Sequence, residues 1–288
     1  MPSSSWFERC AVHPEKHSRN GVVAVPDNYG LLKSRLLQVL GIDLNSYKEQ
    51  QMRRRIDQWL ARHNLKSYEE LVERVRMDAE HRAKFTKYLT INTSQFFRDQ
   101  SVFAAIADHI LPAITTGGNM PRIWSAGCSI GAEIYSIALL LTERGLRARE
   151  LLATDIDEAI LARAREGRFT ESEVGNVPPE MLQRYFSESE HQYVIDARIR
   201  RMVSFARHDL LRDPYPKPFD LILCRNVFIY FTADTQQRLI RSFVSSLRPG
   251  GFFVVGSAEH IMDPDAFGLE RVSYCIYAKS QQKESLRA

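Results

Sequence analysis

From Pro121 onward, short apolar runs alternate with amphipathic helical patterns, and this alternation constrains the fold more than any other feature. The runs "RIWSAG", "ELLATDID" and "FDLILCRNVFIYF" are followed in turn by "EIYSIALLLTERG", "EAILARAREG" and "TADTQQRLIRSFVSSLRPGG". Strands that alternate with helices form a parallel sheet covered on both faces, and such strands are apolar along their length. We therefore predict an α/β fold with a mostly parallel, doubly wound sheet over residues 121–280. The last run, "GLERVSYCIYAKS", has no helix behind it and should lie antiparallel at or near the sheet edge.

The N-terminal part of the chain has a different period. Apolar residues recur every three or four positions over residues 26–93, which predicts a small all-α domain. Two of its helical patterns open with a serine that a glutamate follows three residues later, as in a capping box: Ser46 with Glu49, and Ser67 with Glu70.

The remaining segments complete the division of the chain. Residues 1–25 are polar and lack periodicity, so we expect a disordered tail there and a short C-terminal tail over 281–288. Residues 94–120 are expected to be a linker segment that carries a helix. Within the sheet domain, "VIDARIRRMVSFA" resembles two short strands that meet near Ala197–Arg198. This pattern predicts a small antiparallel β-subdomain inserted at about 168–207.

Composition excludes several classes of protein. A formal net charge of +4 over 288 residues is too weakly basic to diagnose nucleic-acid binding. The four cysteines have no CxxC spacing, which argues against a disulfide framework and a zinc site. No apolar run is long enough to span a bilayer or to act as a secretory leader. We therefore expect a cytoplasmic, monomeric protein without a metal, a nucleic-acid partner or direct membrane insertion.

Polar residues follow three of the predicted strands. Gly127, Gly131 and Glu133 follow the first strand, Asp155 ends the second, and Asn226 follows the third. In open parallel sheets, ligands bind beyond the carboxyl ends of the strands. The glycine loop lacks the GxGxxG pattern, so a plain tight turn is an alternative of equal weight. Glu133 could likewise serve only the dipole of its helix.

The acidic residues favour a nucleoside ligand without a phosphate. Asp155 suits ribose hydroxyls, because a carboxylate accepts several hydrogen bonds, and Asp157 is the better placed of the two to cap the next helix. Asp209, after "VSFAR", could accept a bond from an exocyclic amine, or could be a solvated loop carboxylate. Glu133 would repel a pyrophosphate. S-adenosylmethionine, with a sulfonium and an amino-acid tail, matches this combination as a hypothesis.

Five segments in a fixed order carry a family resemblance: "NTSQFFRD", "SAGCSIGAEIYSIA", "ATDIDEAILARAREG", "CRNVFIYF" and "LRPGGFFVVGSAEHI". They resemble the chemotaxis receptor glutamate methyltransferases, the CheR family, over about residues 28–279. The resemblance implies a class I, Rossmann-like methyltransferase fold with an N-terminal all-α domain and an inserted β-subdomain. It implies methyl transfer from S-adenosylmethionine to glutamate carboxylates in the cytoplasmic helical bundle of chemoreceptors, with S-adenosylhomocysteine as the product.

The resemblance also assigns roles to residues of the site. The residues implied in cofactor binding are Asn92, Ser94, Arg98, Gly127, Glu133, Asp155, Asp209, Leu210, Asn226 and Val227. Arg98 is our candidate for steering the incoming carboxylate, which a guanidinium can hold with two bonds. Tyr230 is expected to orient the same group or to fill the wall of the site. Ile130, Ala132 and Ile134 depart from the family's threonine, glutamate and proline, so we expect weakened or adjusted cofactor binding.

One helix offers a surface for an acidic partner. Lys48, Arg55 and Arg62 recur every seven residues, and Arg53 and Arg54 flank them. This spacing predicts a basic stripe on one helix face that docks against receptor carboxylates. An ordinary solvated face is the alternative.

Two other functions fit the same residues. One is a methyltransferase that acts on a nucleic acid or a small molecule. The other is a non-enzymatic cofactor-binding or docking module that retains the fold, which the exchanges at Ile130 and Ala132 would favour.

Overall fold

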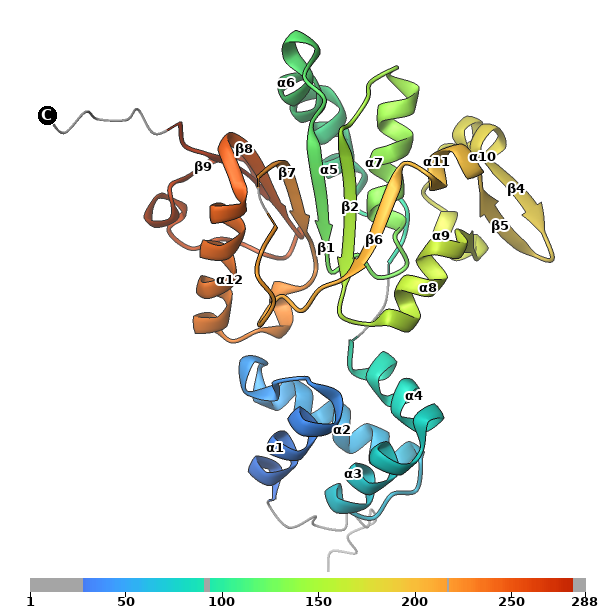
Figure 1. Ribbon diagram of the computed structural model, residues 1–288, viewed down its shortest axis with the longest axis vertical. Helices are drawn as coiled ribbons and strands as arrows, with labels where there is room; N and C mark the ends of the chain where they lie inside the picture. The colour runs from blue at the N-terminus through green and yellow to red at the C-terminus, as the bar shows by residue number, and fades with distance from the viewer. Residues whose placement is uncertain (1–27, 91–93, 217, 282–288) are drawn as a thin grey trace, which may run out of the picture.

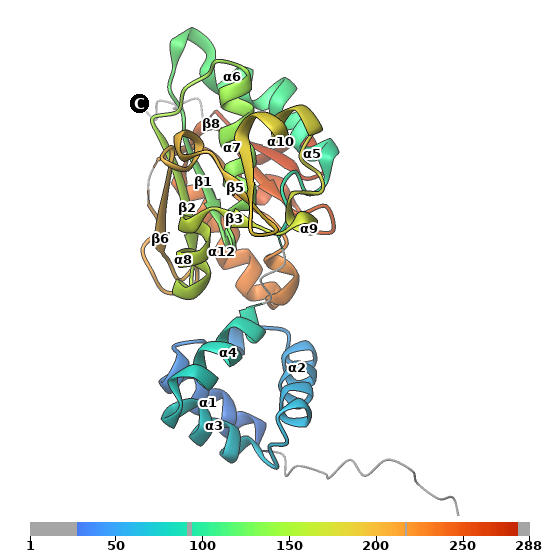
Figure 2. The same cartoon turned by 90° about the vertical axis from the view of Figure 1, so that its right-hand side faces the viewer.

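The computed structural model describes residues 28–90, 94–216 and 218–281. It contains an all-α N-terminal domain and a larger α/β domain (Figure 1; Figure 2). Asn92, Cys10 and both predicted tails other than Gln281 lie outside the described residues. The described helices of the N-terminal domain are α1 (Tyr29–Leu40), η1 (Leu44–Ser46), α2 (Glu49–Arg62), α3 (Tyr68–Met77) and α4 (Ala79–Thr90).

The two predicted capping boxes differ in outcome. The Ser67 side chain accepts a hydrogen bond from the Glu70 amide at 3.2 Å, so Ser67 caps α3 as predicted. The Glu70 carboxylate accepts from the Lys66 amide at 2.7 Å, so the reciprocal half of the box lies one residue earlier. The prediction for Ser46 is wrong, because α2 begins at Glu49 behind Lys48 and Ser46 ends the short helix η1. The Ser46 carbonyl instead accepts a hydrogen bond from the Thr232 amide of the other domain, at 3.0 Å.

The main sheet of the α/β domain has seven strands in the order β6-β2-β1-β7-β8-β10-β9. The strands are β1 (Arg122–Ala126), β2 (Glu150–Asp155), β6 (Val203–Arg207), β7 (Phe219–Cys224), β8 (Leu247–Val255), β9 (Leu269–Ser273) and β10 (Ile276–Lys279). The first five are parallel, and β10 and β9 are antiparallel at the edge. The antiparallel edge position is as predicted, but the run predicted as one strand forms these two. Every residue of β7 is buried, as is typical of a parallel strand covered on both faces. The strand order reverses between β1 and β7, which is where open α/β sheets bind ligands.

Helices cover this sheet and connect its strands (Figure 1). The larger ones are α7 (Ala132–Glu143), α8 (Glu158–Glu166) and α12 (Ala233–Ser246). The shorter ones are α5 (Gln100–Ala105), η2 (Ile106–Ile110), α6 (Leu111–Thr115), η3 (Thr116–Gly118), α9 (Glu171–Val174), α10 (Pro179–Tyr185), α11 (Ala197–Arg200), η4 (Phe228–Tyr230) and η5 (Pro264–Phe267).

The segment predicted as a linker, 94–120, differs from that expectation. Its helices α5 to α6 bury Val102, Ile106 and Ile114 in the core of the α/β domain, so the segment belongs to that domain.

The predicted antiparallel insertion is present but uses other strands. Its small sheet has the order β3-β5-β4, built from Arg168–Phe169, Gln192–Ile195 and Phe186–Ser189. The predicted pairing within "VIDARIRRMVSFA" is wrong, because α11 separates its two strands and β6 pairs in parallel with β2 of the main sheet. Parallel pairing to a distant strand leaves no local sequence pattern, whereas a hairpin does.

Candidate active site

The loop between β1 and α7 is shaped by left-handed backbone. Gly127, Ser129 and Gly131 have φ angles of 71°, 50° and 79°. A Cβ atom at Gly127 would lie 2.8 Å from Cγ2 of Val227, which comes from the turn after β7. Glycine is required at this position by both its φ angle and its close neighbour. The loop and the β7 turn therefore approach each other closely at the point where the strand order reverses.

Asp155 ends β2 directly beside this loop. Its two carboxylate oxygens accept hydrogen bonds from the Ser129 amide at 2.8 Å and the Asp157 amide at 3.1 Å. Burial raises the pKa of Asp155, and the backbone donors oppose that rise. Asp157 accepts from the amides of Ala159 and Ile160 and so caps α8, as predicted. Asp155 is thus left for another role.

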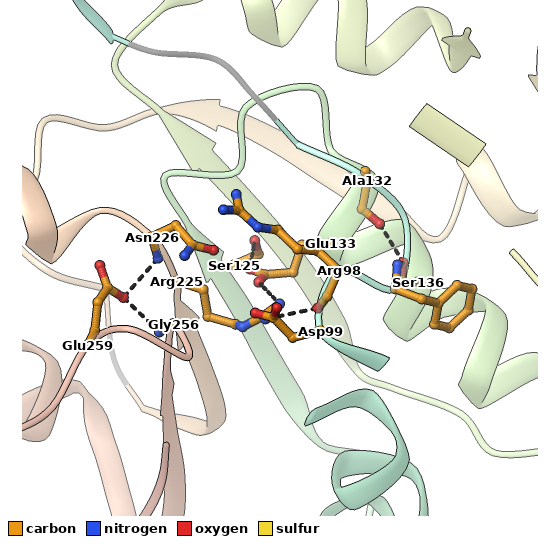
Figure 3. A network of polar contacts seen from close by, with 11 residues as sticks. Arg98, Asp99, Ser125, Ala132, Glu133, Ser136, Arg225, Asn226, Gly256 and Glu259 are labelled. Atoms are coloured by element: carbon orange, nitrogen blue, oxygen red, sulfur yellow. Dashed lines mark hydrogen bonds and ion pairs between the residues drawn. The ribbon is translucent and has the colours of Figure 1, made fainter. Parts of the chain in front are cut away.

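Arg225, which follows β7, joins three parts of the site (Figure 3). Its side chain is buried, with Nη1 3.3 Å from Oε2 of Glu133. Its Nη2 donates to Oδ2 of Asp99 at 2.7 Å and to the carbonyl of Arg98 at 2.9 Å. Ser125 donates to the other oxygen of Glu133 at 2.7 Å. One guanidinium thus fixes both Glu133 and the backbone that carries Arg98.

A second buried ionisable group, Glu259, shapes the turn after β7. Its carboxylate accepts from the amides of Asn226 at 2.8 Å and Gly256 at 2.6 Å (Figure 3). It also accepts from the Ile229 amide at 3.2 Å. Burial raises the pKa of Glu259, and these backbone donors oppose the rise. A Cβ atom at Gly256 would lie 2.8 Å from the Asn226 amide nitrogen. Asn226 is held in a left-handed conformation, with a φ angle of 61°.

The sequence placed Arg225 in the family segment "CRNVFIYF" without assigning it a role, and it did not predict Glu259 as a site residue. A signal for both existed in the sequence, because each charge directly follows an apolar strand pattern, "FDLILC" and "GFFVVGSA". A charge at such a position is expected to be buried and therefore paired. Their partners could not be read from the sequence.

Two adjoining pockets lie beyond the strand ends, and they share Gly127, Asp155 and Val227. The Arg98 pocket is further lined by Ser94, Gln95, Arg98, Cys128, Ser129, Glu133, Arg225 and Asn226. The Asp209 pocket is further lined by Tyr47, Ile156, His208, Asp209, Leu210, Leu211 and Phe231. Every described residue that the sequence assigns to the cofactor lines one of these pockets, and Asn92 lies outside the described residues.

Tyr230 lies on η4 and lines neither pocket. Its side chain is half-buried, and burial raises the pKa of Tyr230, while the positive charges of Arg55 and Arg98 oppose the rise.

The pockets fit a nucleoside that carries a cationic sulfur and no phosphate. The buried Ser129 hydroxyl lines the Arg98 pocket and has no hydrogen-bond partner among the described residues. Asp155 accepts from the Ser129 and Asp157 amides, and a carboxylate has capacity beyond two bonds. Glu133 occupies the first turn of α7, where it complements a positive charge. These donors and acceptors suit S-adenosylmethionine.

The exchanges within the glycine loop lie in the protein core. Ile130, Ala132 and Ile134 are at most 1% exposed and line neither pocket. The hydroxyl and the carboxylate that the family places at two of these positions are therefore replaced by packed apolar groups. Weakened or adjusted cofactor binding stays a prediction.

The predicted docking residues of α2 divide into two groups. Lys48, Arg54 and Arg62 are exposed, and Arg62 also lies over the ring of Tyr88, 5.7 Å from its centroid. Arg53 lies over the ring of Tyr29 on α1, 5.5 Å from its centroid. Arg55 lies over the ring of Tyr88 on α4 at 4.5 Å and donates to the carbonyl of Tyr88. The predicted stripe therefore includes arginines that also hold the domain together.

Two expected absences concern only the described parts of the chain. No three His, Cys, Asp or Glu side chains gather there as a metal site would require. None of the helices in 28–90, 94–216 and 218–281 combines the length and the apolar character needed to cross a membrane.

Known families match both domains. Residues 92–275 match the CheR methyltransferase, SAM binding domain, and residues 27–90 match the CheR methyltransferase, all-alpha domain. The chain belongs to the CheR methyltransferase family. This CheR chain is thus an S-adenosylmethionine-dependent methyltransferase of chemotaxis, and the predicted fold class is confirmed.

Curated relatives agree with this assignment. A chemotaxis protein methyltransferase of Listeria monocytogenes is 37% identical over 244 residues, which cover 84% of this chain and 93% of the relative. Chemotaxis protein methyltransferase 1 of Pseudomonas aeruginosa is 31% identical over 261 residues, which cover 85% of this chain and 95% of the relative. A chemotaxis protein methyltransferase of Escherichia coli is 40% identical over 185 residues, which cover 61% of this chain and 63% of the relative.

Proposed function

We propose that this CheR chain transfers the methyl group of S-adenosylmethionine to glutamate side chains in the cytoplasmic helical bundle of a chemoreceptor. The products are glutamate methyl esters and S-adenosylhomocysteine. The observation that carries the proposal is the pair of adjoining pockets beyond β1, β2 and β7, in which Arg98, Glu133 and Asp155 line one continuous site. The protein would act in the cytoplasm as a monomer, without a metal.

The residues of the Arg98 pocket suit a carboxylate nucleophile. S-adenosylmethionine, when bound, supplies an electrophilic methyl group on a cationic sulfur. A glutamate side chain has an ordinary pKa of about 4.3, so it is ionised at neutral pH and needs no strong base. What the site must supply is alignment, which can lower a barrier by about 7–11 kcal/mol. Arg98 would steer the carboxylate, and Arg225 supports this role because it holds the Arg98 carbonyl at 2.9 Å.

Cofactor contacts follow from the same geometry. Glu133 would bind the cationic amino-acid end of the cofactor, since it faces the Arg98 pocket from the first turn of α7. Asp155 lies between the two pockets and would accept bonds from the ribose hydroxyls. Asp209 and Leu210 line the Asp209 pocket and would contact the base of the cofactor. Ser94, Asn226 and Val227 complete the lining, and Asn92 is proposed from the family motif.

The exposed face of α2 is the proposed receptor surface. Lys48, Arg54 and Arg62 present positive charge to solvent on the domain that adjoins the cleft. Arg53 and Arg55 would contribute charge from the edges of that face, while their aromatic contacts keep them in place. A long acidic helix could lie along such a surface and present one glutamate to the site.

Methyl transfer to receptor-containing membranes tests the proposal directly. Tritiated S-adenosylmethionine would be supplied with receptor membranes, RNA or DNA in parallel. We expect label only in the receptor, release of the label as methanol in base, and mass mapping of the ester to a glutamate. Label in RNA or DNA would instead support the other-substrate alternative. Binding of S-adenosylhomocysteine without any transfer would support a non-enzymatic module.

A further inference from the structure

A separate cavity of about 200 Å³ adjoins the turn that follows β7, and it shares no lining residue with the two cofactor pockets. We call it the Lys48 cavity. Three of its lining residues are exposed and mark where it opens to solvent: Lys48, Ala258 and His260. Its walls are largely apolar and include Phe228, Ile229, Ile240, Val255 and Ile261.

The Lys48 cavity lies beside the proposed position of methyl transfer. Asn226 and Val227, the first residues of the turn, line the Arg98 pocket, whereas Phe228 and Ile229 line the Lys48 cavity. The Glu259 carboxylate accepts from the amides of Asn226 at 2.8 Å and Ile229 at 3.2 Å. One buried carboxylate thus holds both halves of the turn, and only this turn separates the two hollows.

A short backbone clasp fixes Lys48 at the opening of the cavity. The Lys48 amide donates to the Tyr230 carbonyl at 2.8 Å, and the Thr232 amide donates to the Ser46 carbonyl at 3.0 Å. The clasp, residues 46–48 with 230–232, joins the start of α2 to the turn that carries Tyr230. The all-α domain thereby adds a cation to a cavity whose other lining residues belong to the α/β domain.

The accessible charge of the cavity is positive. Lys48 forms no ion pair within the described residues, and the adjacent Glu49 pairs with Lys33 at 3.1 Å. Glu259 also lines the cavity, but it is 4% exposed and its carboxylate is occupied by backbone amides. His260 adds an imidazole that can donate a hydrogen bond. Apolar walls behind a cation suit a side chain with an aliphatic stem and a terminal carboxylate.

We infer that the Lys48 cavity is a specificity site for the substrate helix, and that it holds a second glutamate one helical turn away from the glutamate that is methylated. The inference rests on the proposed function, because it takes the substrate as an acidic helix whose target side chain enters the Arg98 pocket. Side chains three or four positions apart lie on one face of a helix, about 5–6 Å from each other. Two such glutamates can therefore enter two neighbouring hollows, the second with its carboxylate on Lys48 and its stem against Ile229 and Ile240.

The test changes single acids of the receptor and single residues of the full-length enzyme. Receptor variants keep one methylated glutamate and carry glutamine or alanine, one at a time, at the acids three and four positions before and after it. With the wild-type enzyme, we expect one of these acids to raise kcat/KM about fivefold over its glutamine and alanine forms, the value of a surface charge pair. Lys48→Ala should abolish this preference, as should Ala258→Leu, which fills the cavity from its exposed edge.

Matched controls separate this site from receptor docking in general. Lys66→Ala and Ala104→Leu change exposed residues that line neither the cavity nor a cofactor pocket, so both enzymes should keep the preference. Arg54→Glu should lower kcat/KM for every receptor variant by the same factor and leave the preference intact, because it acts on encounter. Calorimetry with S-adenosylhomocysteine should give the same affinity for every enzyme variant, which shows that each is folded.

The outcomes distinguish the inference from the function on which it rests. A wild-type enzyme that methylates all receptor variants at the same rate, or a Lys48→Ala enzyme that keeps the preference, would overturn the inference and leave the proposed function intact. Absence of methyl transfer to every receptor variant and to the unmodified receptor would overturn the proposed function as well.

Discussion

At the scale of single residues, Arg225 shows how one buried charge can organise a site. It holds Glu133, Asp99 and the Arg98 carbonyl. Its Cζ atom lies over the ring of Phe103, 5.4 Å from the ring centroid. Phe97, beside Arg98, is itself fixed by a 3.0 Å bond from its amide to the hydroxyl of Ser136. The sequence predicted Arg98 and Glu133 separately, and the structure connects them through this one guanidinium.

Removal of the Arg225 side chain should therefore damage both stability and binding. Arg225→Met leaves two carboxylates without their shared partner, and we expect a loss of about 3 kcal/mol in the free energy of unfolding. Arg225→Lys keeps the charge but loses the planar guanidinium, so its free energy of unfolding should lie between those of the wild type and Arg225→Met. Arg144→Met, which breaks an exposed 2.6 Å pair with Asp108, is the control and should cost below about 1 kcal/mol. Denaturant melts and calorimetry with S-adenosylhomocysteine would measure both effects, and equal losses for Arg225→Met and Arg144→Met would contradict this role.

A variant of Tyr230 distinguishes orientation of the incoming carboxylate from a packing role. If its hydroxyl orients the incoming carboxylate, Tyr230→Phe should lower kcat about tenfold, the value of one hydrogen bond, and leave the affinity for S-adenosylhomocysteine unchanged. Steady-state methylation of receptor membranes gives kcat, and calorimetry gives the affinity. An unchanged kcat would show that the Tyr230 hydroxyl does not orient the carboxylate.

Asp155 predicts a pH dependence of cofactor binding. Burial raises its pKa above the usual aspartate value of about 3.9, so the ligand-free protein binds this proton more tightly than the unfolded chain does. The stabilisation that this proton gives is present at acid pH and lost as pH rises through the raised pKa. Ribose hydroxyls donate to the ionised form, so ligand binding should lower the pKa again. We therefore expect affinity for S-adenosylhomocysteine to rise with pH across mildly acid values and then level off.

Calorimetry in buffers of different ionisation enthalpy would count the protons. We expect release of up to one proton per ligand in the mildly acid range and none near neutral pH. Asp155→Asn should bind more weakly and lose this proton release. Proton uptake on binding by the wild type would exclude Asp155 as the ribose acceptor.

At the scale of elements, the site depends on turns that buried carboxylates hold. The turn after β7 combines a left-handed Asn226 with three amides on Glu259, and Gly256 leaves the room that this requires. The Ser46 segment shows that a local sequence signal can fail to predict where a helix begins. Its capping-box pattern was a local signal, but Ser46 belongs to η1, where its hydroxyl donates to Asp43, and α2 begins only at Glu49.

Glu259→Gln should loosen this turn. Glutamine has one acceptor oxygen and a donor NH₂ group, so at least one buried amide loses its partner, at a cost of roughly 1–3 kcal/mol. Affinity for S-adenosylhomocysteine should fall too, because Asn226 and Val227 line the cleft. Glu158→Gln, which removes one side of an exposed pair with Arg165, is the matched control. Thermal melts of both variants measure the difference, and an equal shift for the two would argue against the turn-holding role.

At the scale of the whole molecule, two domains form one functional unit. The all-α domain supplies Tyr47 to the cleft and carries the exposed charges of α2. The clasp connects these two roles through the backbone of Lys48. Receptor docking and cofactor binding therefore involve neighbouring parts of the same segment.

Charge reversal on α2 should separate docking from cofactor binding. We expect Arg54→Glu with Arg62→Glu to lower kcat/KM for receptor methylation about tenfold at low salt, since opposite charges across an interface accelerate encounter. Salt should reduce this difference by screening. Arg147→Glu, an exposed change in the loop between α7 and β2, is the control. Affinity for S-adenosylhomocysteine should be the same in all three proteins, and a parallel fall in affinity and activity would disprove the docking assignment.

The sequence by itself determined the parallel sheet, the all-α domain and the acids at the strand ends, because periodicity and capping act over a few residues. It also located Arg98, Glu133, Asp155 and Asp209, since strand ends of a parallel sheet meet at one edge. Only the tertiary structure decided that β6 joins the main sheet, that Arg225 pairs with Glu133, and that Tyr47 enters the cleft. Each of these depends on contacts between segments far apart in the chain, whose partners are chosen by packing and by the pairing of buried charge.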